Sequence, residues 1–184
     1  MPAHEIIIAG FGGQGVLFLC EVLARAAMRD GREVTWLPAY GPEQRGGTAN
    51  CTVVISDEPI GSPVVADPSV LVVLNRPSLD RFEPQVRPGG LIALDSTMVT
   101  RAPARTDVQT VAVPATAIAN ELGSVRAANI VLLGAVLAVR PIVPVGGVRA
   151  ALAEMVNDPD ARTRNDAALE RGRELVSAAV ARAG

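Results

Sequence analysis

The chain has 184 residues, enough for one domain with a buried core, and 49% of them are hydrophobic. Its formal net charge is −2 and only 3% of its residues are aromatic, so we expect neither an electrostatic footprint for nucleic acid nor base-stacking platforms. All 17 basic residues are arginines, which excludes a Schiff-base lysine and a Walker-type lysine on this chain.

The most apolar stretch, residues 16–28, is interrupted by Glu21 and Arg25. It therefore predicts a core helix and not a membrane span, which would need about 18 or more uninterrupted apolar residues. Strand-like residues begin at Glu5 with no basic leader before them. We expect a cytoplasmic protein without membrane contacts.

Cysteine usage is low, with Cys20 in an apolar helical segment and Cys51 in a strand-like run. Two thiols cannot supply the four thiolates of a usual iron–sulfur cluster. A disulfide is not expected either, so both cysteines are predicted to be small core residues.

Strand-like and helix-like segments alternate along the chain, which is typical of a mostly parallel sheet between helices. In order, the first half predicts a strand at 5–9, a helix at 16–29, strands at 33–37, 48–56 and 70–74, a short helix opened by residues 75–78, and a strand at 91–94. The loop between the second and third of these strands is too short for a helical crossover, so we expect that pair to be antiparallel.

The second half is mainly helical. It predicts a strand at 110–113 and helices at 115–122, 127–140, 146–156 and 164–183, with an exposed linker at 157–160. The helix at 127–140 is almost wholly apolar and should be buried on most sides. The predicted fold class is a single α/β, doubly wound, Rossmann-like domain over residues 1–184, with a mostly parallel sheet and helices on both faces.

A glycine-rich loop follows the first predicted strand. Gly10, Gly12 and Gly15 match the G-x-G-x-x-G spacing between a strand and a helix. Such glycines allow a tight turn, and the N-terminus of the following helix favours an anion. Gln14 can extend a long amide side chain into the crevice beside this loop.

A dinucleotide site would also need an acidic residue at the end of the second strand, to bind ribose hydroxyls. Residues 36–40 contain no carboxylate there, and Glu33 lies at the wrong end of the strand. This weighs against NAD(P) or FAD in the usual pose. A free-standing nucleotide-dependent oxidoreductase, and glycines that serve packing alone, remain alternatives.

A second cluster follows the second strand, in residues 41–47. Pro42 restricts the turn, its glycines allow close backbone approach, and Arg45 offers a forked donor for a carboxylate or phosphate. The same composition also suits a solvated surface turn.

Together the motifs G-F-G-G-Q-G and Y-G-P-E-Q-R-G-G, followed by residues 54–60 and Pro63, resemble the gamma subunit of the 2-oxoacid:ferredoxin oxidoreductases. The resemblance extends over nearly the whole chain and weakens in the final helices. Within that family, the motifs G-P-E-Q-R-G-G and I-S-D-E-P-I resemble the 2-oxoglutarate branch most.

The resemblance implies an enzyme that converts a 2-oxoacid and coenzyme A to acyl-CoA and CO2 with reduction of ferredoxin. It implies thiamine diphosphate, Mg²⁺ and iron–sulfur clusters on alpha and beta catalytic partners, with this chain inactive alone and without redox cofactors, metal or catalytic residues of its own. It leaves open whether a small ferredoxin-like delta subunit joins the complex.

Two roles then remain for the two loops: completing the active site or coenzyme A pocket, or docking a scaffold subunit on its partners. The candidate residues are Gly10, Gly12, Gly13, Gln14, Gly15, Gly41, Pro42, Glu43, Gln44, Arg45, Gly46 and Gly47. Asp95 is expected to cap the segment after its strand, and Asn129 to be a satisfied core amide or a contact to the glycine loop.

Overall fold

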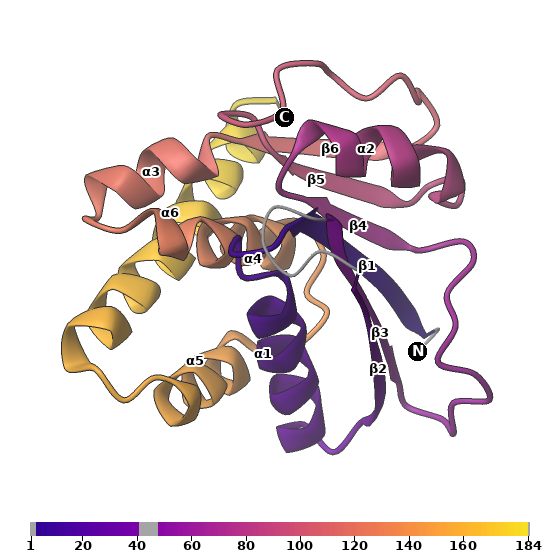
Figure 1. Ribbon diagram of the computed structural model, residues 1–184, viewed down its shortest axis with the longest axis horizontal. Helices are drawn as coiled ribbons and strands as arrows, with labels where there is room; N and C mark the ends of the chain where they lie inside the picture. The colour runs from indigo at the N-terminus through magenta and orange to yellow at the C-terminus, as the bar shows by residue number, and fades with distance from the viewer. Residues whose placement is uncertain (1–2, 41–47, 184) are drawn as a thin grey trace.

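Six strands form one sheet, and helices cover its two faces unequally (Figure 1). The computed structural model describes residues 3–40 and 48–183. The strands lie in the order β2-β3-β1-β4-β5-β6. They are β1 (His4–Phe11), β2 (Glu33–Tyr40), β3 (Thr48–Ser56), β4 (Val70–Val73), β5 (Leu91–Asp95) and β6 (Gln109–Val113).

The helical elements follow the predicted order with small shifts in their bounds. They are α1 (Val16–Arg29), α2 (Arg76–Phe82), the 3₁₀ turn η1 (Glu83–Gln85), α3 (Ala115–Glu121), the 3₁₀ turn η2 (Val125–Ala127), α4 (Ala128–Val139), α5 (Val145–Met155) and α6 (Pro159–Ala183). Within residues 3–40 and 48–183, no helix is both long and apolar enough to span a bilayer.

The sheet is mostly parallel, as predicted. β1, β4, β5 and β6 pair in parallel, whereas β3 runs antiparallel to both of its neighbours, β1 and β2. The predicted antiparallel pairing of β2 with β3 is therefore confirmed. β2 extends beyond its predicted end to Tyr40 and accommodates Pro38, because an edge strand can spare a backbone N–H.

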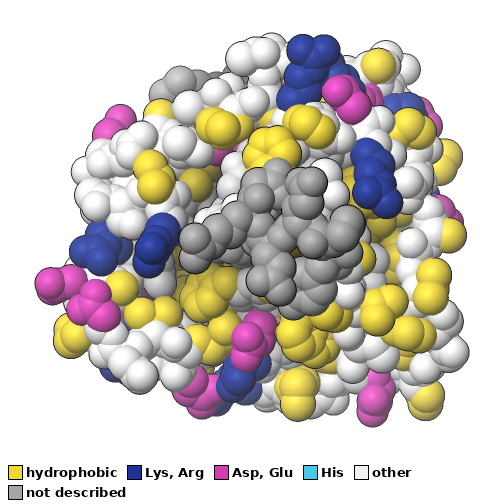
Figure 2. Space-filling model, viewed as in Figure 1, with side chains coloured by type: hydrophobic (Ala, Val, Ile, Leu, Met, Phe, Trp, Pro, Cys, Tyr) yellow, Lys and Arg dark blue, Asp and Glu magenta, His cyan; other side chains and the backbone are white. Residues whose placement is uncertain are grey.

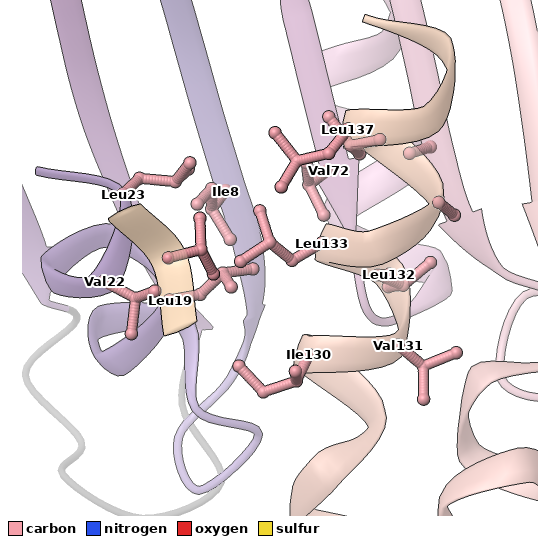
Figure 3. Packing of buried hydrophobic residues seen from close by; sticks show 14 of the residues in the cluster. Ile8, Leu19, Val22, Leu23, Val72, Ile130, Val131, Leu132, Leu133 and Leu137 are labelled. Carbon is pink, nitrogen blue, oxygen red and sulfur yellow. The ribbon is translucent and has the colours of Figure 1, made fainter. Parts of the chain in front are cut away.

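The larger core lies between the sheet and the helices α1 and α4 (Figure 3). Leu19 and Leu23 of α1 face Leu133 of α4 across Ile8 of β1. α4 is buried along nearly its whole length, which explains why its sequence is apolar apart from Asn129. Both cysteines belong to this core with no exposed surface, as predicted, and burial raises the pKa of the Cys20 thiol well above its usual range.

The opposite face carries a smaller core beneath α2 and η1. Leu79 and Phe82 cover Ile7, Leu71 and other residues that point to this side of the sheet. Helices thus lie on both faces, but α1, α3, α4, α5 and α6 share one of them (Figure 1). That asymmetry places the long helices beside the loop after β1.

One prediction was partly wrong: the exposed linker between α5 and α6 ends at Asp158, and residues 159–160 already belong to α6. Pro159 is the first residue of α6, and both carboxylate oxygens of Asp158 accept hydrogen bonds, at 3.2 Å from Asp160 N and 3.3 Å from Ala161 N. Aspartate before a helix with proline at its first position is a common start signal, since the ring fixes φ and the missing N–H is not needed there.

Candidate functional site

The loop after β1 turns sharply into α1 through two glycines with positive φ. Gly13 has φ +96° and Gly15 has φ +77°, a region that side chains other than glycine rarely adopt. Gly15 is also the N-cap residue of α1 and provides no side-chain cap. The first-turn N–H groups of α1 therefore lack a side-chain acceptor from the cap position, which leaves them suited to an anion.

Gln14 extends its amide into the crevice between neighbouring strand ends, where its polar atoms are occupied by hydrogen bonds within the chain. Its Oε1 accepts from Phe11 N at 2.7 Å and from Asn75 Nδ2 at 3.2 Å, and its Nε2 donates to the Leu74 carbonyl at 3.0 Å. The amide thus fills the gap between the carboxyl ends of β1 and β4. Gly10 makes room for it, because a Cβ there would lie 2.7 Å from Oε1.

This gap is the topological switch point of the sheet, where doubly wound folds usually bind their ligand. The chain leaves β1 toward β2 and β3 on one side, and β4, β5 and β6 lie on the other. Two amide side chains occupy the position. The arrangement agrees with the missing acid after β2 in arguing against a dinucleotide in the usual pose.

Asn129 holds the same loop from the helical side. Its Nδ2 donates to the Gly15 carbonyl at 3.0 Å, and its Oδ1 accepts from Ile130 N at 2.8 Å. The predicted contact between this core amide and the glycine loop is confirmed. A Cβ on Gly15 would overlap the Asn129 amide, so glycine is required there for space as well as for φ.

A pocket of about 610 Å³ opens beside the loop. The starts of α1, α4 and α6 converge on it, together with η2. Its lining combines polar and apolar groups: Gly13, Gly15, Phe18, Ser124, Arg126, Ala127, Asn129, Val156, Asp158, Ala161, Arg164 and Asn165. We define these twelve residues as the loop pocket.

The loop pocket has the electrostatics of an anion site. First-turn residues of α1, α4 and α6 line it, so the positive ends of three helix dipoles lie beside the pocket. Arg126 is exposed and forms no ion pair with any described residue, while Arg164 lies 3.8 Å from Asp158. Asp158 is already engaged with the first turn of α6. Formal charges of the lining sum to one net positive.

The predicted site residues have different outcomes. Gly13 and Gly15 line the loop pocket, Gly10 accommodates Gln14, and Gly12 is exposed in the same turn. The whole second cluster, Gly41, Pro42, Glu43, Gln44, Arg45, Gly46 and Gly47, lies outside the described residues.

Asp95 is fully buried and caps the chain after β5, as predicted. It accepts from Thr97 N at 3.1 Å and binds the backbone N–H and hydroxyl of Thr116, at the start of α3. Its carboxylate is thereby occupied within the fold, so it does not join the loop pocket.

Sequence reasoning missed Arg126, Arg164 and Asn165. They lie more than 100 residues from the glycine loop, on η2 and α6. The pattern S-x-R before an apolar helix and the D-P start of α6 could have suggested two helix N-termini, but not their convergence on the glycine loop.

Among the described residues, no group of three or more His, Cys, Asp or Glu side chains is arranged to hold a metal ion. The prediction that this chain carries no redox cofactor or metal of its own stays a prediction.

Comparison with known proteins identifies the family. A model of the pyruvate ferredoxin/flavodoxin oxidoreductase family matches residues 5–175. The ketoisovalerate oxidoreductase subunit VorA of Methanothermobacter thermautotrophicus is 53% identical over 137 residues, 74% of this chain. The chain spans only 28% of that relative's length.

Other relatives match in length. The 2-oxoglutarate synthase subunit KorC of Methanocaldococcus jannaschii is 38% identical, over 83% of each chain. The solved gamma subunit of a keto/oxoacid ferredoxin oxidoreductase from Geobacter sulfurreducens is 30% identical, with a TM-score of 0.86 over 97% of this chain and 98% of that one.

The fold recurs within a larger chain as well. A 2-oxoglutarate:ferredoxin oxidoreductase from Magnetococcus marinus has a TM-score of 0.88 over 97% of this chain and 32% of its own, at 24% identity, which is a likeness of fold. On the family match and the length-matched relatives, the chain belongs to the pyruvate ferredoxin/flavodoxin oxidoreductase family, and it is similar over 97% of its length to a solved gamma subunit.

Proposed function

We propose that the chain is the gamma subunit of a complex that oxidises a 2-oxoacid with coenzyme A to acyl-CoA and CO2 and passes two electrons to ferredoxin. Alpha and beta partners would carry the thiamine diphosphate, Mg²⁺ and iron–sulfur clusters that supply carbanion and redox chemistry. This chain would bind and orient a substrate and dock on those partners. The length-matched gamma-type relatives support this division of labour.

The observation that carries the proposal is the loop pocket, which we assign to the phosphate groups of coenzyme A. Backbone N–H groups at the start of α1 and the guanidinium groups of Arg126 and Arg164 provide donors suited to phosphate oxygens. The volume of about 610 Å³ is large enough for part of a nucleotide-sized ligand. The Magnetococcus marinus enzyme, similar in fold, was solved with coenzyme A bound, which makes coenzyme A the first anion to test.

Docking on partner subunits is supported by the surface. Large hydrophobic side chains are exposed on β2, where Trp36 and Leu37 are 45% and 44% exposed, and at Val125 beside the loop pocket. Figure 2 shows mostly uncharged surface on the viewed face, with hydrophobic side chains between scattered charges. Exposed large hydrophobic side chains such as Trp36 and Leu37 are candidates for contact with a partner. The scaffold role and the pocket role are compatible.

Two classes of 2-oxoacid compete as substrate. The motifs G-P-E-Q-R-G-G and I-S-D-E-P-I favour 2-oxoglutarate, and the KorC relatives are named as subunits of 2-oxoglutarate synthase. The 53% identity to a ketoisovalerate oxidoreductase subunit favours a branched-chain 2-oxoacid. We keep 2-oxoglutarate as the proposal and ketoisovalerate as its alternative, and the assembled enzyme separates them by kcat/KM.

The pocket assignment is tested with Arg126→Ala and Arg164→Ala in the assembled complex. Each change removes a charged donor, and we expect the KM for coenzyme A to rise about tenfold or more while the KM for the 2-oxoacid stays constant. Higher salt should weaken coenzyme A binding less in these variants than in the wild type.

Arg25→Ala is the matched control, since Arg25 forms an exposed ion pair with Glu21 on α1 away from the pocket. It should leave both KM values unchanged. Intact assembly with unchanged coenzyme A dependence in both pocket variants would contradict the assignment and leave the docking role alone.

A further inference from the structure

We infer that Gln14 is a positioning residue for the loop pocket and that Asn75 acts through it; this inference rests on the proposed function. Gln14 stands in sequence between Gly13 and Gly15, which both line the pocket, yet it does not itself line the pocket. Its side chain turns to the other side of the loop and makes three hydrogen bonds there.

These hydrogen bonds tie the glycine loop to the ends of the two neighbouring strands, β1 and β4. Oε1 accepts from Phe11 N at 2.7 Å, which holds the turn against its own strand. Nε2 donates to the Leu74 carbonyl at 3.0 Å, which ties the turn to the end of β4. The backbone adds a further link, since Leu74 N donates to the Ala9 carbonyl at 3.0 Å.

Asn75, which lies between β4 and α2, completes the arrangement. Its Nδ2 donates to Gln14 Oε1 at 3.2 Å, while its Oδ1 accepts from Ser78 N at 2.9 Å as the N-cap of α2. Asn75 is 2% exposed and Gln14 is half-buried, so the Asn75 side of the pair is shielded from competing water. The buried amide of Asn75 thus caps α2 on one face of the sheet and also binds Gln14 of the glycine loop at the carboxyl end of β1.

This geometry predicts an effect on binding rather than on folding alone. Glycine-rich turns lose much conformational freedom when a ligand orders them, and that loss weakens affinity. Gln14 removes part of that freedom in advance, because its side chain ties the residue that follows Gly13 to Phe11 N, at the start of the loop, and to the Leu74 carbonyl after β4. Without its hydrogen bonds, the N–H groups that meet the anion would have to be ordered by the anion itself.

Two substitutions separate positioning from stability. Gln14→Met keeps the size of the side chain and removes all three hydrogen bonds. Asn75→Ser keeps a good N-cap for α2 but replaces the Nδ2 donor to Gln14 with a shorter hydroxyl group. Gln85→Met is the control, because Gln85 is an exposed amide whose Nε2 reaches only the Arg81 carbonyl of its own turn, at 3.4 Å.

In the assembled complex, we expect the KM for coenzyme A to rise about tenfold in Gln14→Met and about threefold in Asn75→Ser. The KM for the 2-oxoacid should not change. The double variant should resemble Gln14→Met alone, because Asn75 acts through Gln14. Gln85→Met should match the wild type.

Three results would overturn the inference. The first is an unchanged KM for coenzyme A in both variants while Arg126→Ala and Arg164→Ala raise it, which leaves the proposed function standing. The second is a loss that follows thermal stability and affects both KM values and kcat equally, which makes Gln14 structural only. The third is strict additivity in the double variant. If the arginine variants also have no effect, the assignment of the loop pocket to coenzyme A fails as well, and the docking role alone remains.

Discussion

Glu83, a carboxylate with 4% exposure, holds residues 101–105 onto η1. It accepts from Arg101 Nη2 at 2.7 Å, from Arg105 N at 3.0 Å and from Ala104 N. Burial by itself would raise the pKa of Glu83, but the hydrogen bonds from Arg101 and from these backbone groups outweigh it, so the pKa lies below the usual 4.5.

A carboxyl group with a depressed pKa stabilises the folded state above its unfolded pKa, and that contribution is lost as the pH falls through the folded value. We expect Glu83→Gln to lower the free energy of unfolding at neutral pH by about 1.5–3 kcal/mol. Because the variant lacks the titrating group, the difference from wild type should shrink below a pH of about 4.5. Denaturant unfolding of the purified protein at neutral and acidic pH measures both effects.

Glu174→Gln is the control, since Glu174 is exposed on α6 and should change stability little at either pH. A Glu83→Gln variant as stable as the wild type at neutral pH would contradict this account. So would a difference from wild type that does not depend on pH.

For single residues, the sequence predicted the role of those whose partners are close along the chain or whose side-chain type allows few roles. Asp95 as a cap and Asn129 as a core amide belong to this class. The hydrogen-bond partners of Gln14 were not predicted, because its acceptor at Leu74 lies 60 residues away and only the sheet brings it near. Arg126 and Arg164 have ordinary surface patterns and gave no local signal.

The crossing of α4 and α6 depends on two glycines, one on each helix. A Cβ on Gly134 would overlap the Leu169 carbonyl, and a Cβ on Gly172 would overlap the Val131 carbonyl. Both obstacles are backbone atoms, which cannot rotate away. The two helices therefore pack at backbone contact, and this crossing positions the start of α6 beside the loop pocket.

We expect Gly134→Ala to lower the free energy of unfolding by about 3 kcal/mol, the upper part of the range for an overpacked core. Gly146→Ala is the matched control, because a Cβ added to Gly146 in α5 would meet no atom of the described residues within 4 Å. There alanine should stabilise the helix by about 0.5 kcal/mol. Thermal unfolding of both variants compares them, and equal melting temperatures would contradict close packing at the crossing.

Most helices and strands could be predicted from the periodicity of apolar residues and from glycine and proline at their ends. α1 and β3 have the predicted bounds, and other ends differ by up to three residues except at α6. The start of α6 was missed because Asp158 and Pro159 also suit a turn, and only the two hydrogen bonds from the helix to Asp158 distinguish the cases.

For the whole molecule, the fold class followed from the alternation of segments, and the antiparallel β3 from the short loop before it. The strand order was not predicted, since neighbours such as β1 and β4 are separated by nearly 60 residues. The loop pocket was not predicted for the same reason. Its lining comes from residues 13–18, 124–129 and 156–165, which meet only when the helices pack on one face.

The central claim is that this chain works as the gamma subunit of a 2-oxoacid oxidoreductase, and affinity purification of the tagged chain from its host under anaerobic conditions tests it most directly. We predict co-purifying thiamine-diphosphate and iron–sulfur subunits, and dye reduction that requires both coenzyme A and a 2-oxoacid, with 2-oxoglutarate compared against ketoisovalerate. A chain that purifies alone with its own bound nucleotide would contradict the claim and restore a free-standing nucleotide-binding protein.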